Sequence, residues 1–328
     1  MSSGAPTTHA RAAWGSSVLR WFDSWADMDA LRAERVEVRD QRVEWLRTLP
    51  FLLLHLACAA VIWVGWSWTA VAVALALYLV RMFAITAFYH RYFSHRAFET
   101  SRAAQFVFAL LGNSAVQRGP LWWAAHHREH HQNSDTEADT HSPTQHGFWW
   151  SHVGWILSRS NFATRLERVK DLAVYPELRF LDRFDSVAPL ALFASLYGVG
   201  EVLASFAPGL GTSGWQLVVW GGVISTVVLF HATFTINSLA HVWGERRYAT
   251  RDTSRNNLWL ALITLGEGWH NNHHYYPGAA RQGFRRWEID PSYYALLALE
   301  RLGVVWDLRP APAKVLEEGA DAATRKSS

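Results

Sequence analysis

The strongest constraint on folding is an almost wholly apolar run from Leu49 to Tyr89, interrupted near Gly65-Trp66-Ser67-Trp68. At ~1.5 Å of rise per helical residue, its roughly 40 residues are enough for two crossings of a ~30 Å hydrocarbon layer. The run therefore predicts a helical hairpin with spans at about 49–65 and 69–89. Arg81 lies inside the second span, where a charge must reach the interface, pair, or line a polar cavity.

Two further apolar segments, 187–207 and 215–236, are each long enough to cross once, and the turn-forming linker 208–214 joins them. Neither hairpin tip contains Lys or Arg, whereas the segments before, between and after the hairpins are rich in arginine. By the positive-inside rule, those segments and both termini are expected on the cytoplasmic side, as in a bacterial inner membrane. The sequence thus predicts an all-α integral membrane protein with four transmembrane helices and a cytosolic helical cap.

The spans and the cap are predicted to form one unit, residues 49–308. Residues 1–48 are expected to be a flexible tail followed by a cytosolic or interfacial helix. The first part is small and polar, and the second part alternates arginines with acids and has no long apolar run. Residues 309–328, with two prolines and many small and charged residues, predict a flexible tail. The apolar segments 106–116 and 258–265 are too short to cross.

Histidines gather in three tight clusters: His90 and His95; His126, His127, His130 and His131; and His270, His273 and His274. Helical positions i, i+3 and i+4 share one face, so the last three members of the second cluster, and all of the third, can converge on a common point. Positions five apart diverge by about 140°, so the helix carrying His90 is expected to end or loosen before His95. Such recurrence predicts a metal site held by histidine.

The composition limits what kind of site this can be. The single cysteine, Cys58, excludes a disulfide framework, a cysteine-rich zinc module and an iron–sulfur cluster built from this chain. The 19 tryptophans suggest membrane-interface belts. The formal charge of +3 comes from scattered arginines without a basic stripe, so nucleic acid is not an expected partner. Imidazole suits iron, zinc, copper or nickel, and eight or nine of them are enough for two metals.

The clusters resemble the histidine boxes of the membrane fatty acyl desaturases, the family of the stearoyl-CoA desaturases, over about Leu49 to Trp306. The matching motifs are His90-Arg91-Tyr92-Phe93-Ser94-His95, His127-Arg128-Glu129-His130-His131, His270-Asn271-Asn272-His273-His274 and Asn237-Ser238-Leu239-Ala240-His241. The His-Arg pair favours His127 over His126, which spacing left open. The resemblance implies nine ligands to two iron ions, with Asn237 acting through a bound water: His90, His95, His127, His130, His131, His241, His270, His273 and His274.

Other residues receive roles from position or resemblance. Asp135, Asp139 and Glu267 lie within a few residues of a cluster and are expected to orient ligating imidazoles, since a ligating histidine usually donates its other N–H to an acceptor. The resemblance implies that Gln117, Trp123 and Thr233 line the bend of a substrate tunnel. Phe88 stands where animal enzymes carry glycine, two residues before a ligand, so its ring is expected to shape that tunnel. Arg159 is a candidate contact for carrier phosphates.

The reaction that the resemblance implies inserts a cis double bond into a long-chain acyl thioester of coenzyme A or acyl carrier protein. It uses dioxygen and two electrons from a separate ferredoxin- or cytochrome-type donor with a reductase, because the chain shows no haem-binding or flavin-binding domain. A hydroxylase or acetylenase with the same chemistry is the main alternative. A membrane zinc hydrolase is less favoured, because it would need fewer histidines and usually a glutamate base.

Overall fold

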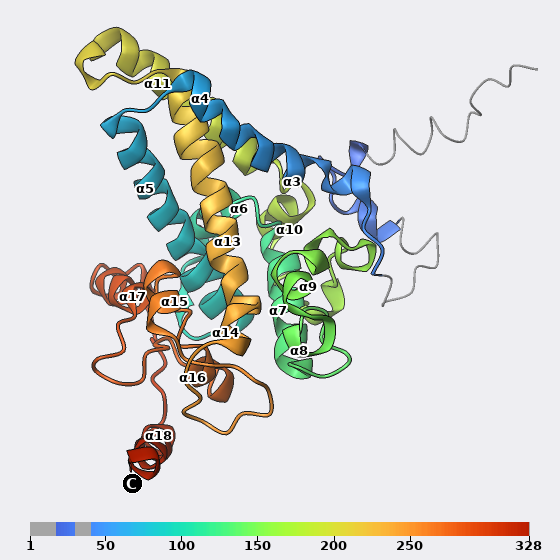
Figure 1. Cartoon of the computed structure of the whole chain (residues 1–328), viewed down its shortest axis with the longest axis vertical. Coiled ribbons are helices and arrows are strands. Elements are labelled where there is room, and N and C mark those ends of the chain that lie inside the picture. Colours follow the sequence, from blue (N-terminus) through green and yellow to red (C-terminus); the bar gives the residue numbers. More distant parts are fainter. Residues whose placement is uncertain (1–17, 30–40, 328) are drawn as a thin grey trace, which may run out of the picture.

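The computed structural model describes residues 18–29 and 41–327, with side chains up to residue 320. Four of its helices are long and apolar enough to cross a membrane: Trp45–Val64, Trp68–Ser94, Val187–Phe206 and Gly214–Val242. The four predicted spans are therefore confirmed. The second and fourth helices run several residues past their predicted ends, because the polar segments that carry His90 and His241 continue the helix. Figure 1 shows the long helices gathered at one end and the short ones at the other.

Each span is built from consecutive helical segments. They are α3 (Trp45–Ala57), η1 (Cys58–Ala60) and α4 (Val61–Val64) in the first; α5 (Trp68–Phe83) and η2 (Ala84–Ser94) in the second; α11 (Val187–Phe206) in the third; and α12 (Gly214–Leu217), η7 (Val218–Ile224), α13 (Ser225–Asn237) and α14 (Leu239–Val242) in the fourth. The first hairpin turns at Gly65, whose φ of 64° favours glycine. Ser67 then caps α5 by accepting a hydrogen bond from the Ala70 amide.

The cap is made of short helices that cover the ends of the spans. Its elements are β1 (Glu99–Thr100), α6 (Arg102–Asn113), α7 (Pro120–Asn133), α8 (Pro143–His146), α9 (Phe148–His152), η3 (Gly154–Leu157), η4 (Arg159–Asn161), η5 (Leu166–Arg168), α10 (Pro176–Arg183), α15 (Leu258–Ile263), α16 (His270–Tyr275), α17 (Pro291–Arg301), β2 (Val305–Trp306) and α18 (Ala313–Ser327). The remaining short helix, η6 (Pro208–Leu210), lies outside the cap, in the linker between α11 and α12. β1 and β2 pair antiparallel, with Glu99 opposite Trp306. This pairing joins the chain after η2 to the end of α17.

The second span changes helix type where it enters the cap. η2 is a π-helix of 11 residues and ends at Ser94, so the helix does end before His95, as predicted. The i→i+5 bonding of a π-helix brings residues five apart onto one side. The rings of His90 and His95 consequently lie 5.0 Å apart. The wider helix solves the spacing problem that an α-helix would have created.

Arg81 is buried in the second span and is bonded entirely to neutral groups. Its guanidinium donates to the hydroxyls of Thr226 at 2.6 Å and Ser225 at 2.7 Å. It also donates to the carbonyls of Ser114 at 3.2 Å and Gly221 at 3.3 Å. Arg81 therefore connects α5 to the fourth span and to the turn after α6. Of the three possibilities that the sequence left open for this charge, the structure has the polar environment between helices.

The C-terminal segment differs from the flexible tail predicted from residue 309. The structure has a helix there, α18, and its apolar residues Val315 and Leu316 pack against Tyr248 and Phe284. The Tyr248 hydroxyl also donates to the Val315 carbonyl at 2.9 Å. The few apolar side chains of this mostly charged segment pack against residues that are distant in the sequence, and composition alone does not predict such contacts. Residues 1–17, part of the predicted N-terminal tail, lie outside the described residues.

Replacing Arg81 by Met should lower the stability of the detergent-solubilised protein. Methionine keeps an unbranched, flexible stem and removes the donors, which leaves the Ser114 and Gly221 carbonyls without this partner. Hydrogen bonds to a charged group contribute about 1.5–3 kcal/mol, so a fall of this order in unfolding free energy is expected. Thermal unfolding measures it. Val80→Met, at a neighbouring residue that is 46% exposed, is the control, and equal stability of the two variants would contradict the role of Arg81.

Candidate metal centre

The nine histidines expected as ligands come together in two groups. One contains His90, His95, His127, His131 and His273, and the other contains His130, His241, His270 and His274. Within each group, one donor atom from every residue lies within 4.8 Å of all the others. Each group could hold a metal ion. The assignment of all nine as ligands remains a prediction that this geometry supports.

The i, i+3, i+4 clusters do not converge on one point, as the sequence analysis had expected. In α7, His127 and His131 belong to the first group and His130 to the second. At ~100° per residue, position i+4 lies about 40° to one side of i, and i+3 lies about 60° to the other. α16 repeats the division, with His273 in the first group and His270 in the second. Each helix thus serves two neighbouring centres from one face.

The ring nitrogens of each group face one another at short distances. The Nε2 atoms of His95 and His127 are 2.8 Å apart, and Nε2 of His273 is 2.9 Å from Nε2 of both His90 and His131. In the second group, the Nε2 atoms of His241 and His270 are 3.1 Å apart. Several inward nitrogens in one buried volume cannot all donate to each other. A shared cation would satisfy all of their lone pairs at once.

Carboxylates hold the outer nitrogen of four of these rings. His130 Nδ1 lies 3.0 Å from Asp139 and His241 Nδ1 lies 3.2 Å from Asp135. Glu267 contacts Nδ1 of His90. All three carboxylates predicted to orient imidazoles therefore lie where that role requires. A ring that donates from Nδ1 to a carboxylate presents an unprotonated Nε2 inward, which is the tautomer a metal needs.

Asp252 is a fourth carboxylate of this kind, and the sequence analysis missed it. Its Oδ2 lies 2.8 Å from His274 Nδ1, while Nε2 of that ring is buried without a hydrogen-bond partner. Asp252 follows His241 by eleven residues in a loop, so no helical spacing points to it. Its own backbone turn is fixed by a 3.0 Å hydrogen bond from the Ser254 amide. Only the tertiary structure brings this loop against α16.

Electrostatics keep most of these rings neutral. Burial, followed by neighbouring imidazoles, lowers the pKa values of His95, His127, His131, His270 and His273 well below the ordinary value. Burial lowers the pKa of His274 to about 4, although Asp252 acts in the opposite direction. His130 differs, because its pairing with Asp139 outweighs burial and raises its pKa. Neutral imidazoles near pH 7 are the form that binds a metal.

Arg91 links the first histidine box to the third. Its side chain is buried and donates to Asp290 through two nitrogens at 3.0 Å and to the Ala280 carbonyl at 2.8 Å. It also donates to Glu267 at 3.2 Å, and Glu267 in turn holds His90. Gly266 has a φ of 123°, and a Cβ there would collide with Asp290 and Arg91. Glycine before Glu267 is therefore required for this network.

Spacing left open whether His126 or His127 faces the other histidines, and the rotation of α7 about its axis places His127 there. His126 belongs to neither group and packs against Trp122 and Trp155, with ring centroids 4.4 Å and 5.9 Å away. The start of α7 is fixed by Asp182, a buried carboxylate that accepts a 2.7 Å hydrogen bond from the Trp122 amide. This bond satisfies one of the free amides at the helix start and sets which face meets the other boxes.

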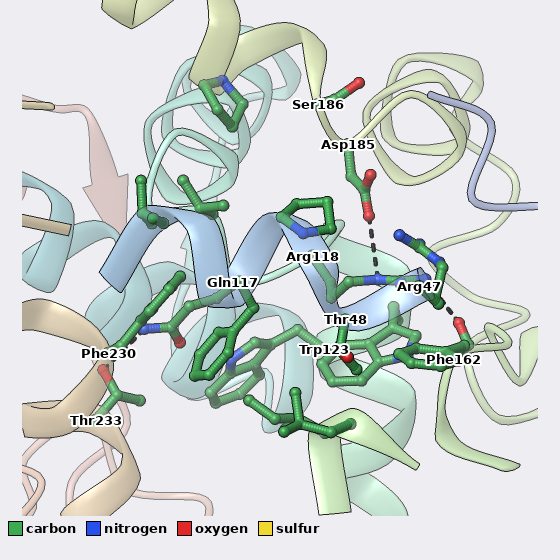
Figure 2. Close-up of a pocket in the computed structure, with 18 of the residues that line it drawn as sticks. Arg47, Thr48, Gln117, Arg118, Trp123, Phe162, Asp185, Ser186, Phe230 and Thr233 are labelled. Carbon is green, nitrogen blue, oxygen red and sulfur yellow. Dashed lines mark hydrogen bonds and ion pairs between the residues drawn. The ribbon is translucent and has the colours of Figure 1, made fainter. Parts of the chain in front are cut away.

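A largely apolar cavity of about 420 Å³ leads to the histidines. Gln117, Trp123 and Thr233 line it, as the resemblance implied, and Gln117 Nε2 donates to the Thr233 hydroxyl at 3.0 Å. Figure 2 shows this pair at one end of the cavity and Arg47 and Arg118 toward the other. His127 and Asn237 also line it, so the cavity touches the metal centre.

A second cavity of about 40 Å³ lies beside the histidines, between η2, α7, α13 and the turn that follows α15. Trp123, His127, Thr233 and Asn237 line both cavities. The two cavities therefore share one boundary, which includes Trp123 and Thr233, two of the three residues expected at a tunnel bend.

Phe88 and Arg159 do not lie where substrate contacts were expected. Phe88 is fully buried and lines neither cavity; its ring stacks on Phe108 with centroids 3.8 Å apart. Phe88 lies two residues before His90 in the π-helix, and residues two apart project from different faces of a helix. Its ring therefore points away from the histidines. Arg159 Nε lies 3.9 Å from Glu44, outside the residues that line the cavities. Neither residue lines either cavity, and their roles as substrate contacts stay predictions.

Three histidines outside the boxes, His55, His152 and His231, form a hydrogen-bonded chain. Nε2 of His55 lies 3.1 Å from His231, and the other nitrogen of His231 lies 3.1 Å from His152. His152 Nδ1 lies 2.9 Å from the Ser238 hydroxyl, and the Ser151 hydroxyl donates to the Asn237 carbonyl at 2.6 Å. The chain thereby fixes the break between α13 and α14, which orients both Asn237 and His241.

Comparison with known proteins agrees with this architecture. Residues 66–296 match the fatty acid desaturase family model. The chain is 38% identical to an icosanoyl-CoA 5-desaturase of Limnanthes douglasii, over 80% of this chain and 71% of that protein. It is 37% identical to an sn-1 stearoyl-lipid 9-desaturase of Anabaena variabilis, over 83% and 96%. An sn-2 palmitoyl-lipid 9-desaturase of a Nostoc strain is 32% identical, over 90% and 99%. The chain therefore belongs to the membrane fatty acid desaturase family.

Proposed function

We propose that the two histidine groups hold two iron ions and that the enzyme inserts a cis double bond into a long-chain fatty acyl group. The observation that carries this proposal is that an apolar cavity reaches His127 of the first group, while the small cavity beside it is lined by members of both groups. A desaturase needs both: a redox centre, and a dry space that holds an unreactive chain against it.

The donor set supports iron over a catalytic zinc. Zinc typically takes three protein ligands and a water, whereas these groups offer five and four imidazoles. Imidazole is among the ligands that suit iron. Bound there, two irons would supply the redox chemistry that reduces dioxygen.

The chain's own residues hold the substrate and exclude water. The Trp123 ring stacks on His127 with centroids 5.0 Å apart and lines both cavities, so it separates the acyl chain from the ligands. The Gln117–Thr233 hydrogen bond forms a fixed wall opposite. The overall reaction removes two hydrogens, takes up two electrons and two protons, and reduces dioxygen to two waters. The two electrons have to come from a separate donor protein with its reductase.

Expression of the chain in a host lacking desaturases should produce cis-monounsaturated acyl chains. Gas chromatography and mass spectrometry of total lipids measure the product. His131→Ala should abolish it, because that ring belongs to the first group. Leu302→Ala, at an exposed residue of the cap outside both groups, is the control and should retain activity. A hydroxylated or acetylenic product would replace the desaturase proposal by the alternative chemistry.

Asp252→Asn should remove metal from one group only. The neutral amide oxygen accepts the hydrogen bond from His274 Nδ1 more weakly than the carboxylate does, and loss of such a partner typically costs about 10 to 100-fold in metal affinity. Purified protein should therefore fall from about two irons per chain to about one. Asp307→Asn, at a carboxylate whose side chain is 61% exposed, is the control. One iron per chain in the unsubstituted protein, or unchanged iron in Asp252→Asn, would contradict the assignment.

We also propose that the cap and the chain termini face the cytoplasm, because the arginine-rich segments lie on the cap side and the hairpin tips lack Lys and Arg. In a Cys58→Ala background, Gly209→Cys should react with a membrane-impermeant maleimide in intact cells. A side chain at Gly209 meets no atom within 4 Å, so cysteine fits. Leu302→Cys, 75% exposed in the cap, should react only after permeabilisation. The reverse pattern would invert the proposed topology.

A further inference from the structure

The large cavity opens sideways between the first and third spans. α3 contributes Pro50, Phe51 and Leu54 to its wall, and α11 contributes Leu190 and Phe193. Pro50 is exposed and Leu190 is 54% exposed, so these two residues both line the cavity and face the outside. The opening therefore lies between two helices that cross the membrane. In Figure 1 the first span slants away from the vertical spans as it approaches the cap.

The depth of this opening corresponds to the interface between headgroups and hydrocarbon. Pro50 is five residues into the first span and Leu190 is three residues into the third. At ~1.5 Å per residue these positions lie about 8 Å and about 5 Å from the span ends. A lipid with its headgroup at the surface would have the start of its acyl chain at this level.

The N-terminal segment covers part of the side that faces the cap. Trp21 and Phe22 line the cavity. The Trp21 indole donates to the Leu46 carbonyl at 3.1 Å, and the Trp25 indole donates to Asp182 at 2.9 Å. The segment is thus fastened to both α3 and α10. This segment reduces access to the cavity from water, and the passage between α3 and α11 stays open.

The cations that line the cavity are neutralised by carboxylates of the same chain. Arg47 pairs with Asp27 at 3.2 Å, and Arg118 pairs with Asp185 at 3.1 Å and with Asp27 at 3.7 Å. Figure 2 shows the Arg118–Asp185 pair beside the cavity. Opening such pairs would leave buried carboxylates next to any incoming phosphate, which is unfavourable. The part of the cavity wall formed by Arg47 and Arg118 is therefore close to neutral and suits a neutral or zwitterionic group.

The arginines farther along the cap are occupied as well. Arg165 contacts Glu129, and Arg168 donates to Glu129 at 3.1 Å and to Gln132 at 2.7 Å. These side chains would have to exchange their partners to bind the several phosphates of coenzyme A. Recognition of a polyanion normally uses arginines that are available for bidentate contact.

We propose that the substrate is an acyl chain esterified in a membrane glycerolipid, which enters sideways between α3 and α11 while its headgroup stays at the bilayer surface. The proposal rests on the proposed desaturase function and specifies its carrier. It selects the lipid-linked class, one of the two classes that the names of the relatives contain. The tunnel then needs no site for a soluble thioester.

The test compares two carriers with the same protein. Iron-replete enzyme is reconstituted in phosphatidylcholine vesicles with a ferredoxin, its reductase and NADPH, and without coenzyme A, ATP or acyltransferase. In one arm the vesicle lipid carries deuterated palmitoyl and stearoyl chains; in the other, the same label is supplied as coenzyme A thioesters. Labelled double bonds are expected in the intact lipid of the first arm. Product confined to the thioester arm would overturn the proposal, while absence of product in both arms would overturn the desaturase function beneath it.

The sideways route is tested by narrowing its opening. Leu190→Trp places a large ring at the edge of the cavity, so turnover of lipid-linked chains should fall about tenfold or more while iron content and thermal stability stay unchanged. Val199→Trp is the matched control, because Val199 is on the same helix, is 52% exposed and does not line the cavity. Equal turnover by the two variants would overturn entry between α3 and α11.

Discussion

The structure depends on holding nine imidazole nitrogens inward in a buried volume. A neutral ring has one N–H, and four of these rings direct Nδ1 toward a carboxylate, so the facing nitrogens cannot all be satisfied by one another and a cation would accept their lone pairs. The cap supplies the forces that maintain it, since four carboxylates fix outer nitrogens and Arg91 fixes one of those carboxylates. The protein part of the site is therefore a rigid frame of the kind that metal centres require.

The same helices serve as membrane spans and as supports of the site. The second span continues into the π-helix that carries His90, and the fourth continues into α14, which carries His241. The cavity runs between the spans and ends at those continuations. An apolar chain lying along the cavity would consequently approach the histidines without leaving an apolar environment. This continuity explains why the site lies at the ends of the spans.

Charge is used in two different ways in the buried regions. Arg81 is bonded to hydroxyls and carbonyls, so it joins helices without a carboxylate among its contacts. Arg47 and Arg118, at the cavity, are instead paired with acids. The first arrangement stabilises the helix packing. The second leaves the cavity rim close to neutral, which bears on the kind of carrier that can approach it.

The amino-acid sequence by itself determined the spans and the family, and it predicted the nine histidines that the structure gathers in two groups. Hydropathy and length act locally, so the four spans could be read from apolar runs, and the boxes could be read because their spacing is short. The tertiary structure decided how the boxes divide. Whether His130 joins His127 or His241 depends on where other helices place their rings, and this information is absent from the spacing within α7. Asp252, the burial of Phe88 against Phe108 and the docking of α18 likewise depend on contacts between segments far apart in the chain. Such contacts form only when the whole chain packs, because a side chain's partner is set by the arrangement of helices and not by its sequence neighbours.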